Sequence, residues 1–137
     1  MTLYDDDFVS WTQQQGTLLR SMSAVNGLDI ENLVDEIEGL GRAAVAELED
    51  AIRRVFEGLL RRSIDPSSTS IEDILSAQYE AVIRSDAGVW RHVDLDKIWR
   101  LAKRPLDIVR SERCPITIEQ LISEDFGVEE SVTALRL

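Results

Sequence analysis

The residues of this sequence that could do chemistry are mainly carboxylates, and four of them are candidates for a metal site. Asp35, Glu36 and Glu38 lie within one predicted helix, and Asp125 lies near the C-terminus. Carboxylate oxygens are the ligands that Mg²⁺ and Ca²⁺ prefer. Such a cluster would suit a metal-dependent hydrolase or nuclease. The alternative is a solvated acidic helix face on which Arg42 pairs with Glu38, and charged faces of this kind are routine on surface helices.

Nucleophilic and cofactor chemistry have weaker signals. His92 is the only histidine, and the sequence contains no Glu-x-x-His pair of the kind that builds a di-iron site. No histidine neighbours Cys114 to activate its thiol, and a single cysteine is more often a small buried apolar residue. Glycine-rich phosphate loops, dinucleotide fingerprints and nucleophile elbows are absent from the sequence. We therefore expect no catalytic residue and no cofactor.

Net charge restricts the possible partners. The 137 residues include 26 acidic and 15 basic side chains, which gives a net charge of −11 and argues against affinity for nucleic acids or anionic membranes. The charge is uneven, with a net −9 over residues 1–50, +2 over residues 51–113 and −4 over residues 114–137. An acidic protein that mimics nucleic acid or neutralises a basic partner, as an antitoxin does, is an alternative function.

The same composition predicts a cytoplasmic protein of one domain over residues 1–137. The first residues lack the positive start and apolar run of a signal peptide. No stretch approaches the ~18 apolar residues of a membrane helix. One domain is the default at this length. Residues 128–137 have weak helix signals, and we expect them to fray.

Apolar residues recur with a period of 3.6, and no segment alternates long enough to predict a strand, so the fold class is all-α. The strongest pattern predicts one long central helix over residues 30–62, with Asp29 as its N-cap. Three to four shorter helices are expected to complete a bundle around it. They are predicted near residues 6–23, 71–85, 89 or 94 to 103, and 118–123.

Local signals indicate where two of the shorter helices begin and which face one of them buries. Either Ser70 or Thr69 is expected to cap the helix that follows, and Thr69 with Glu72 has the spacing of a capping box, as Thr117 has with Gln120. The helix near residues 71–85 is expected to bury one apolar face. That face consists of Ile71, Ile74, Leu75, Gln78, Tyr79, Val82 and Ile83.

The long helix is the element best suited to contact a partner. It would be roughly 50 Å long, more than the diameter expected for a globule of this size. Gly39 and Gly41 could break it, or could permit close approach of another helix. A short chain does not fully cover so wide an apolar stripe, which favours a protein partner or a homodimer through this helix. The stripe consists of Leu33, Ile37, Leu40, Ala44, Leu48, Ile52, Val55 and Leu59.

Three sequence blocks resemble a known family. They read LYDDDFVSWTQQ at residues 3–14, DIENLVDEIEGLGR at residues 29–42 and CPITIEQLISEDF at residues 114–126. In this order they resemble the bacterial domain-of-unknown-function family twenty-nine, whose members are small helical proteins from cyanobacteria and proteobacteria. The resemblance implies the fold over about residues 3–126 and no particular activity. Residues 58–62 read GLLRR where family members typically have an HLLKW-like stretch, so a histidine-dependent site there would be missing.

These observations predict a non-catalytic, acidic, helical protein-interaction module that could also associate with itself. If the other helices of the chain covered the whole apolar stripe, the result would instead be a monomeric bundle.

Overall fold

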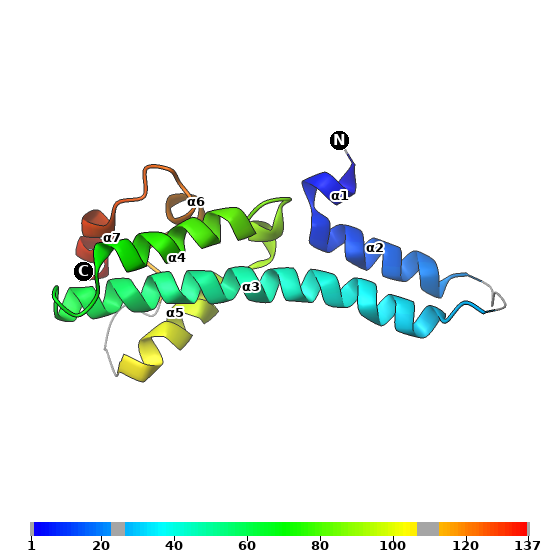
Figure 1. Cartoon of the computed structure of the whole chain (residues 1–137), viewed down its shortest axis with the longest axis horizontal. Helices are drawn as coiled ribbons and strands as arrows, with labels where there is room; N and C mark the ends of the chain where they lie inside the picture. Colours follow the sequence, from blue (N-terminus) through cyan, green and yellow to red (C-terminus); the bar gives the residue numbers. More distant parts are fainter. Residues whose placement is uncertain (1, 23–26, 107–112, 137) are drawn as a thin grey trace.

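One helix, α3 (Ile30–Ile64), runs the length of the molecule, and the other elements pack along it (Figure 1). The computed structural model describes residues 2–22, 27–106 and 113–136, and within these ranges the chain has helices and no strand. At 35 residues α3 is ~52 Å long. It passes through Gly39 and Gly41 without interruption. The prediction of an all-α bundle around one long central helix is confirmed.

The N-terminal segment forms two helices where one was expected. α1 (Leu3–Asp6) is followed by α2 (Phe8–Arg20), because Asp7 leaves the helical conformation and caps α2. Its carboxylate accepts a hydrogen bond from the Ser10 amide at 3.1 Å, which satisfies a donor that helix geometry leaves free. The expected end at residue 23 lies outside the described residues. α2 lies beside the N-terminal half of α3 (Figure 1).

The remaining helices gather around the C-terminal half of α3, where the core lies (Figure 1). They are α4 (Ile71–Arg84), the 3-10 helix η1 (Val89–His92), α5 (Leu95–Lys103), the 3-10 turn η2 (Arg104–Leu106), α6 (Ile118–Leu121) and α7 (Val128–Leu135). Phe56 of α3 and Trp99 of α5 meet edge to face at 5.6 Å between ring centroids. Both side chains are fully buried, so this pair lies at the centre of the core.

α4 buries a face that overlaps only in part with the one predicted, since Ile74 and Gln78 are shared. Its buried residues are Ile74, Ala77, Gln78 and Ala81, whereas Ile71, Leu75, Tyr79 and Ile83 are exposed. Ala77 and Ala81 are small, and Gly58 of α3 leaves room for Ile74, whose Cγ1 lies 2.7 Å from where a Cβ would be. The face that permits the closest approach is therefore buried, although the other face is more apolar. The helix is capped by Ser70, one of the two caps expected, which accepts from the Asp73 amide, so the alternative box of Thr69 with Glu72 is wrong.

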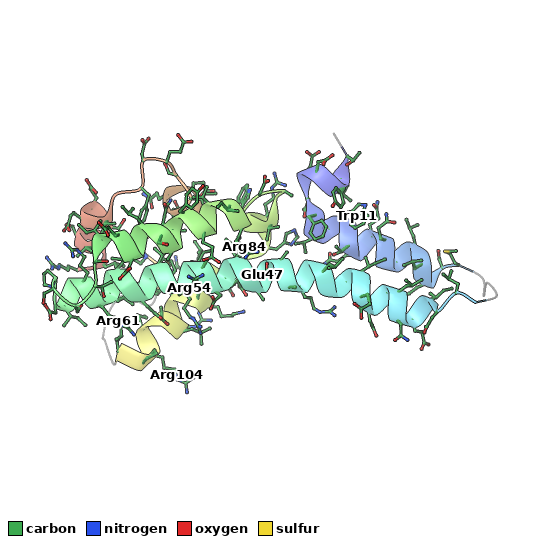
Figure 2. The ribbon with its side chains drawn as sticks, in the orientation of Figure 1. Trp11, Glu47, Arg54, Arg61, Arg84 and Arg104 are labelled. Atoms are coloured by element: carbon green, nitrogen blue, oxygen red, sulfur yellow. The ribbon has the colours of Figure 1, made fainter. Side chains whose placement is uncertain are left out.

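Ion pairs fix α4 against α3. Arg54 Nη2 lies 2.7 Å from Glu80 Oε2, and Arg84 Nη1 lies 2.6 Å from Glu47 Oε2. Figure 2 shows Arg84 on α4 and Glu47 on α3 at the edge between the two helices. Exposed pairs such as these contribute at most about 1 kcal/mol each. Their effect is to orient a helix that has apolar residues on two faces.

The C-terminal segment packs into the core, although we expected it to fray. Val128, Val132 and Leu135 of α7 are all buried, because their spacing places them on one face that meets α3. Arg62 adds an ion pair to Glu129 at 2.8 Å. The predicted capping box of α6 is confirmed, since Thr117 and Gln120 exchange both hydrogen bonds. That helix ends at residue 121, before the expected residue 123.

Candidate interaction site

α2 packs closely against α3 because each helix presents a glycine to the other. A Cβ at Gly41 would collide with Thr12 Oγ1, and a Cβ at Gly16 would collide with the Glu38 carboxyl group. Val34 and Gly41 are buried and lie seven residues apart, so they mark the line along which α3 meets α2. We call α2 together with residues 30–47 of α3 the arm.

One flank of the arm is polar. Asp35 and Arg42 each follow a residue of the contact line by one position, and successive helix residues are turned by about 100°. Both therefore lie on the same side of the contact. The ion pair between Arg20 and Glu38, at 2.7 Å, shows that the matching side of α2 is also polar. A cleft of about 410 Å³ opens here, lined in part by Gln13, Glu38 and Arg42.

The histidine of the chain lies at this cleft, paired with a carboxylate 85 residues earlier. His92 Nε2 lies 2.7 Å from Asp7 Oδ1, a hydrogen-bond distance, and both side chains are largely buried. Burial alone would raise the pKa of Asp7. The hydrogen bonds from the Ser10 amide and from His92 outweigh it and hold that pKa below its usual value. No local pattern in the sequence indicates that Asp7 and His92 are partners.

Three ionisable groups that line the cleft, Glu38, Glu49 and His92, are engaged with protein partners. Glu38 pairs with Arg20, and His92 pairs with Asp7. Glu49 accepts from the Asp94 amide and lies 3.5 Å from the Lys97 ammonium. These pairs orient the elements that carry them. They join α3 to η1 and α5, and they join the N-cap of α2 to η1.

The other flank of the arm is apolar and open. Leu33 and Leu40 each precede a residue of the contact line by one position, so they lie opposite the flank of Asp35 and Arg42. Their exposed fractions are 37% and 57%. We call this surface the apolar flank. Its apolar residues are the half-buried Trp11 and Leu19 from α2, with Leu33, Ile37, Leu40 and Ala44 from α3. The half-buried Gln15 lies between Trp11 and Leu19 on α2, and the exposed Leu18 and Met22 border the surface.

Aromatic rings close the base of the apolar flank. Tyr4 meets Trp11 edge to face at 4.9 Å, and Phe8 stacks on Trp11 at 5.9 Å. Figure 2 shows Trp11 on α2, beside the bend that leads from α1. Tyr4 is half exposed. The cluster is therefore a preformed aromatic platform, with about 0.5–1.5 kcal/mol of attraction per pair beyond burial.

The predicted stripe of α3 divides into two parts. Leu48, Ile52, Val55 and Leu59 are fully buried, whereas Leu33 and Leu40 are exposed. The change falls where the layer of α4, α5 and α7 ends and only α2 remains beside α3 (Figure 1). The N-terminal part of the stripe thus has the apolar residue types of a protein core, although Leu33 and Leu40 are exposed to solvent.

The four candidate metal ligands do not come together. Asp35 and Glu36 are exposed on the arm, and Glu38 pairs with Arg20. Asp125 is exposed in the segment between α6 and α7, which lies over the other half of α3 (Figure 1). Within the part of the chain that the structure describes, no three histidine, cysteine or acidic residues are arranged to hold a metal ion.

Cys114 is held as a neutral thiol. Burial, with a smaller contribution from the nearby Asp96 carboxylate, raises its pKa to about 11. Its Sγ donates to the Ile116 carbonyl at 3.2 Å. Because the thiolate is the nucleophile, this environment opposes covalent catalysis at neutral pH.

Fold and site together define a class of small all-helical protein with a projecting two-helix arm. The chain belongs to the family described as the domain of unknown function DUF29, whose model matches residues 3–127. It is also similar to an alpha-helical protein of unknown function from Rhodospirillum rubrum, known from a crystal structure. The TM-score is 0.79 at 23% identity, over 98% of both chains, and this likeness supports the fold. No curated protein matches the chain. Among the described helices, none has the length and apolar character to cross a membrane.

Proposed function

We propose that this protein is a cytoplasmic, non-catalytic interaction module whose apolar flank binds a helical segment of another protein. The observation that carries the proposal is the division of the α3 stripe. The same run of residues is fully buried at Leu48 and Leu59 and is 57% exposed at Leu40. Contiguous exposed apolar residues on a soluble protein mark interaction sites more often than scattered ones do.

The shape of the arm favours a helix as the bound element. Two antiparallel helices leave a groove between their flanks, and a third helix fills such a groove with ridges-into-grooves packing. Residues 33–44 of α3 extend over ~17 Å, which matches about three turns of a partner helix. Glycine contacts at Gly16 and Gly41 hold the two helices of the arm together, so the surface is formed before the partner arrives.

Site-specific photocrosslinking in the native cell tests this proposal. A photoreactive residue at position 40 probes the apolar flank, and one at position 42, two residues along the same exposed helix, probes the polar flank. We expect a discrete adduct from position 40 and none from position 42. Leu33→Gln, on the same flank, should abolish the adduct. Mass spectrometry of the adduct should locate the crosslink in a helical segment of the partner.

Two results would overturn the proposal. One is equal labelling from positions 40 and 42, which would indicate random encounters at an exposed helix. The other is an adduct from position 40 that survives Leu33→Gln, since a partner seated on the apolar flank must contact both leucines.

A further inference from the structure

We infer that the segment bound on the apolar flank is a basic amphipathic helix, an inference that rests on the proposed function. Its carrying observation is the distribution of charge around the arm. Glu36 lies just beyond Leu33 and Leu40 on the solvent side of the flank, by helix geometry. Asp29, the N-cap, precedes Glu36 by seven residues and so lies near the same side, and its carboxylate accepts from the Asn32 backbone and side-chain amides. Both are exposed, so the outer rim of the flank is acidic.

The basic residues of the arm lie elsewhere. Arg20 and Arg42 are its only two arginines, and it has no lysine. Arg20 is paired with Glu38 on the polar flank, and Arg42 lines the cleft there. The apolar flank therefore has an acidic rim with no compensating cation of the arm beside it. A partner helix with apolar residues at i, i+3, i+4 and i+7 and lysine or arginine along its edges is complementary to it.

The same charges argue against a second copy of this chain. Two arms facing one another through their apolar flanks would each bring an acidic rim to the interface. Like charges facing one another across an interface are unfavourable. The homodimer through the long helix, expected as one option from the sequence, is thus less well matched electrostatically than a basic helix.

A pair of synthetic peptides tests the inference with the intact protein. One 16-residue peptide has leucines in the helical repeat and lysines elsewhere, and the matched peptide has glutamates in place of the lysines. A third has the composition of the first in an order that forms no apolar face. By fluorescence anisotropy at physiological salt, we expect the patterned basic peptide to bind at least tenfold more tightly than either control.

Variants of the protein separate the surface from the overall charge. Leu40→Gln should weaken binding of the patterned basic peptide about tenfold, and Glu36→Gln about threefold. Asp35→Asn removes the neighbouring acid, on the polar flank, and should leave the affinity for the peptide unchanged. It changes the net charge of the protein by the same amount as Glu36→Gln does. Raised salt should weaken the wild-type complex more than that of Glu36→Gln.

Several outcomes would refute a basic helical partner. Equal loss from Glu36→Gln and Asp35→Asn would show that net charge alone binds the peptide. A dimer in sedimentation that Leu40→Gln dissociates would assign the flank to a second copy. Binding to lipid vesicles that Leu40→Gln abolishes would assign it to a membrane. A photocrosslinked adduct between position 40 and an acidic segment of the partner would refute this inference and leave the proposed function standing. If no adduct forms from position 40, both the inference and the proposed function are refuted.

Discussion

Gly39 and Gly41 provide a matched test of how the arm is packed, because they lie two residues apart on one helix. Alanine stabilises a helix interior by about 0.5–1 kcal/mol relative to glycine. A Cβ at Gly39 would meet only the flexible end of Arg42, at 3.5 Å. Gly39→Ala should therefore stabilise the protein by about 0.5–1 kcal/mol, or ~2–4 °C in Tm for a chain of this size.

Gly41→Ala should have the opposite sign. Its Cβ would collide with Thr12 Oγ1, and the fully buried Thr12 hydroxyl donates to the Val9 carbonyl at 2.6 Å. Overpacking costs about 1–3 kcal/mol, which exceeds the gain in helix propensity, so we expect a net loss of ~1–2 kcal/mol. Thr12→Ala removes the obstructing oxygen. In that background Gly41→Ala should cost less, and the difference is the coupling energy.

Urea denaturation followed by circular dichroism measures both variants, with the slope m checked for constancy. Gly39→Ala serves as the control for helix propensity, since it changes the same residue type in the same helix. If Gly41→Ala stabilises the protein as much as Gly39→Ala does, then α2 does not pack against α3 as described. The definition of the apolar and polar flanks would fail with it.

Three further predictions test other parts of the structure. Ile74→Ala should destabilise the protein by about 2–4 kcal/mol in urea denaturation, whereas Leu75→Ala should cost under about 1 kcal/mol. Equal costs would indicate that α4 buries the face predicted from the sequence. Asp7→Asn keeps a capping side chain and removes the charge, so its stability cost should be larger at pH 6 than at pH 3. A carboxylate with a lowered pKa stabilises the fold above its unfolded pKa, and the effect disappears as the pH falls through the folded value. A cost independent of pH would contradict the lowered pKa of Asp7. Cys114, with a pKa of about 11, has about one thiolate per thousand molecules at pH 8. Iodoacetamide should therefore label Cys114 far more slowly in the folded protein than in the guanidinium-unfolded chain. Equal labelling rates would show that the thiol is not buried.

The elements that could be predicted from sequence are those set by local signals. α3 has a period of 3.6 over nine turns and an N-cap at Asp29, and both depend on neighbouring residues alone. The capping box of Thr117 with Gln120 is local in the same sense. The class of helical bundle follows from such signals and needs no knowledge of contacts between helices.

What could not be predicted depends on residues distant in the chain. α4 has apolar residues on two faces, and the choice between them is made by Gly58 and by two alanines that permit close approach. Gln78 adds a hydrogen bond to the Leu121 carbonyl at 2.9 Å, across 43 positions. The pairing of Asp7 with His92 spans 85 positions. Sequence periodicity shows that a stripe is apolar, and it gives no information on which part of the stripe the chain covers.

The two ends of α3 therefore have different roles, although their residue patterns are alike. The C-terminal part binds the other helices and forms the core around Phe56 and Trp99. The N-terminal part packs mainly against α2, through contacts at Gly16 and Gly41, and the described residues leave Leu33 and Leu40 on its apolar flank exposed. Rigidity obtained in this way lowers the entropy lost when a partner docks. The close glycine packing and the exposed leucines beside it are thus two parts of one arrangement: a surface kept open and already in its bound shape.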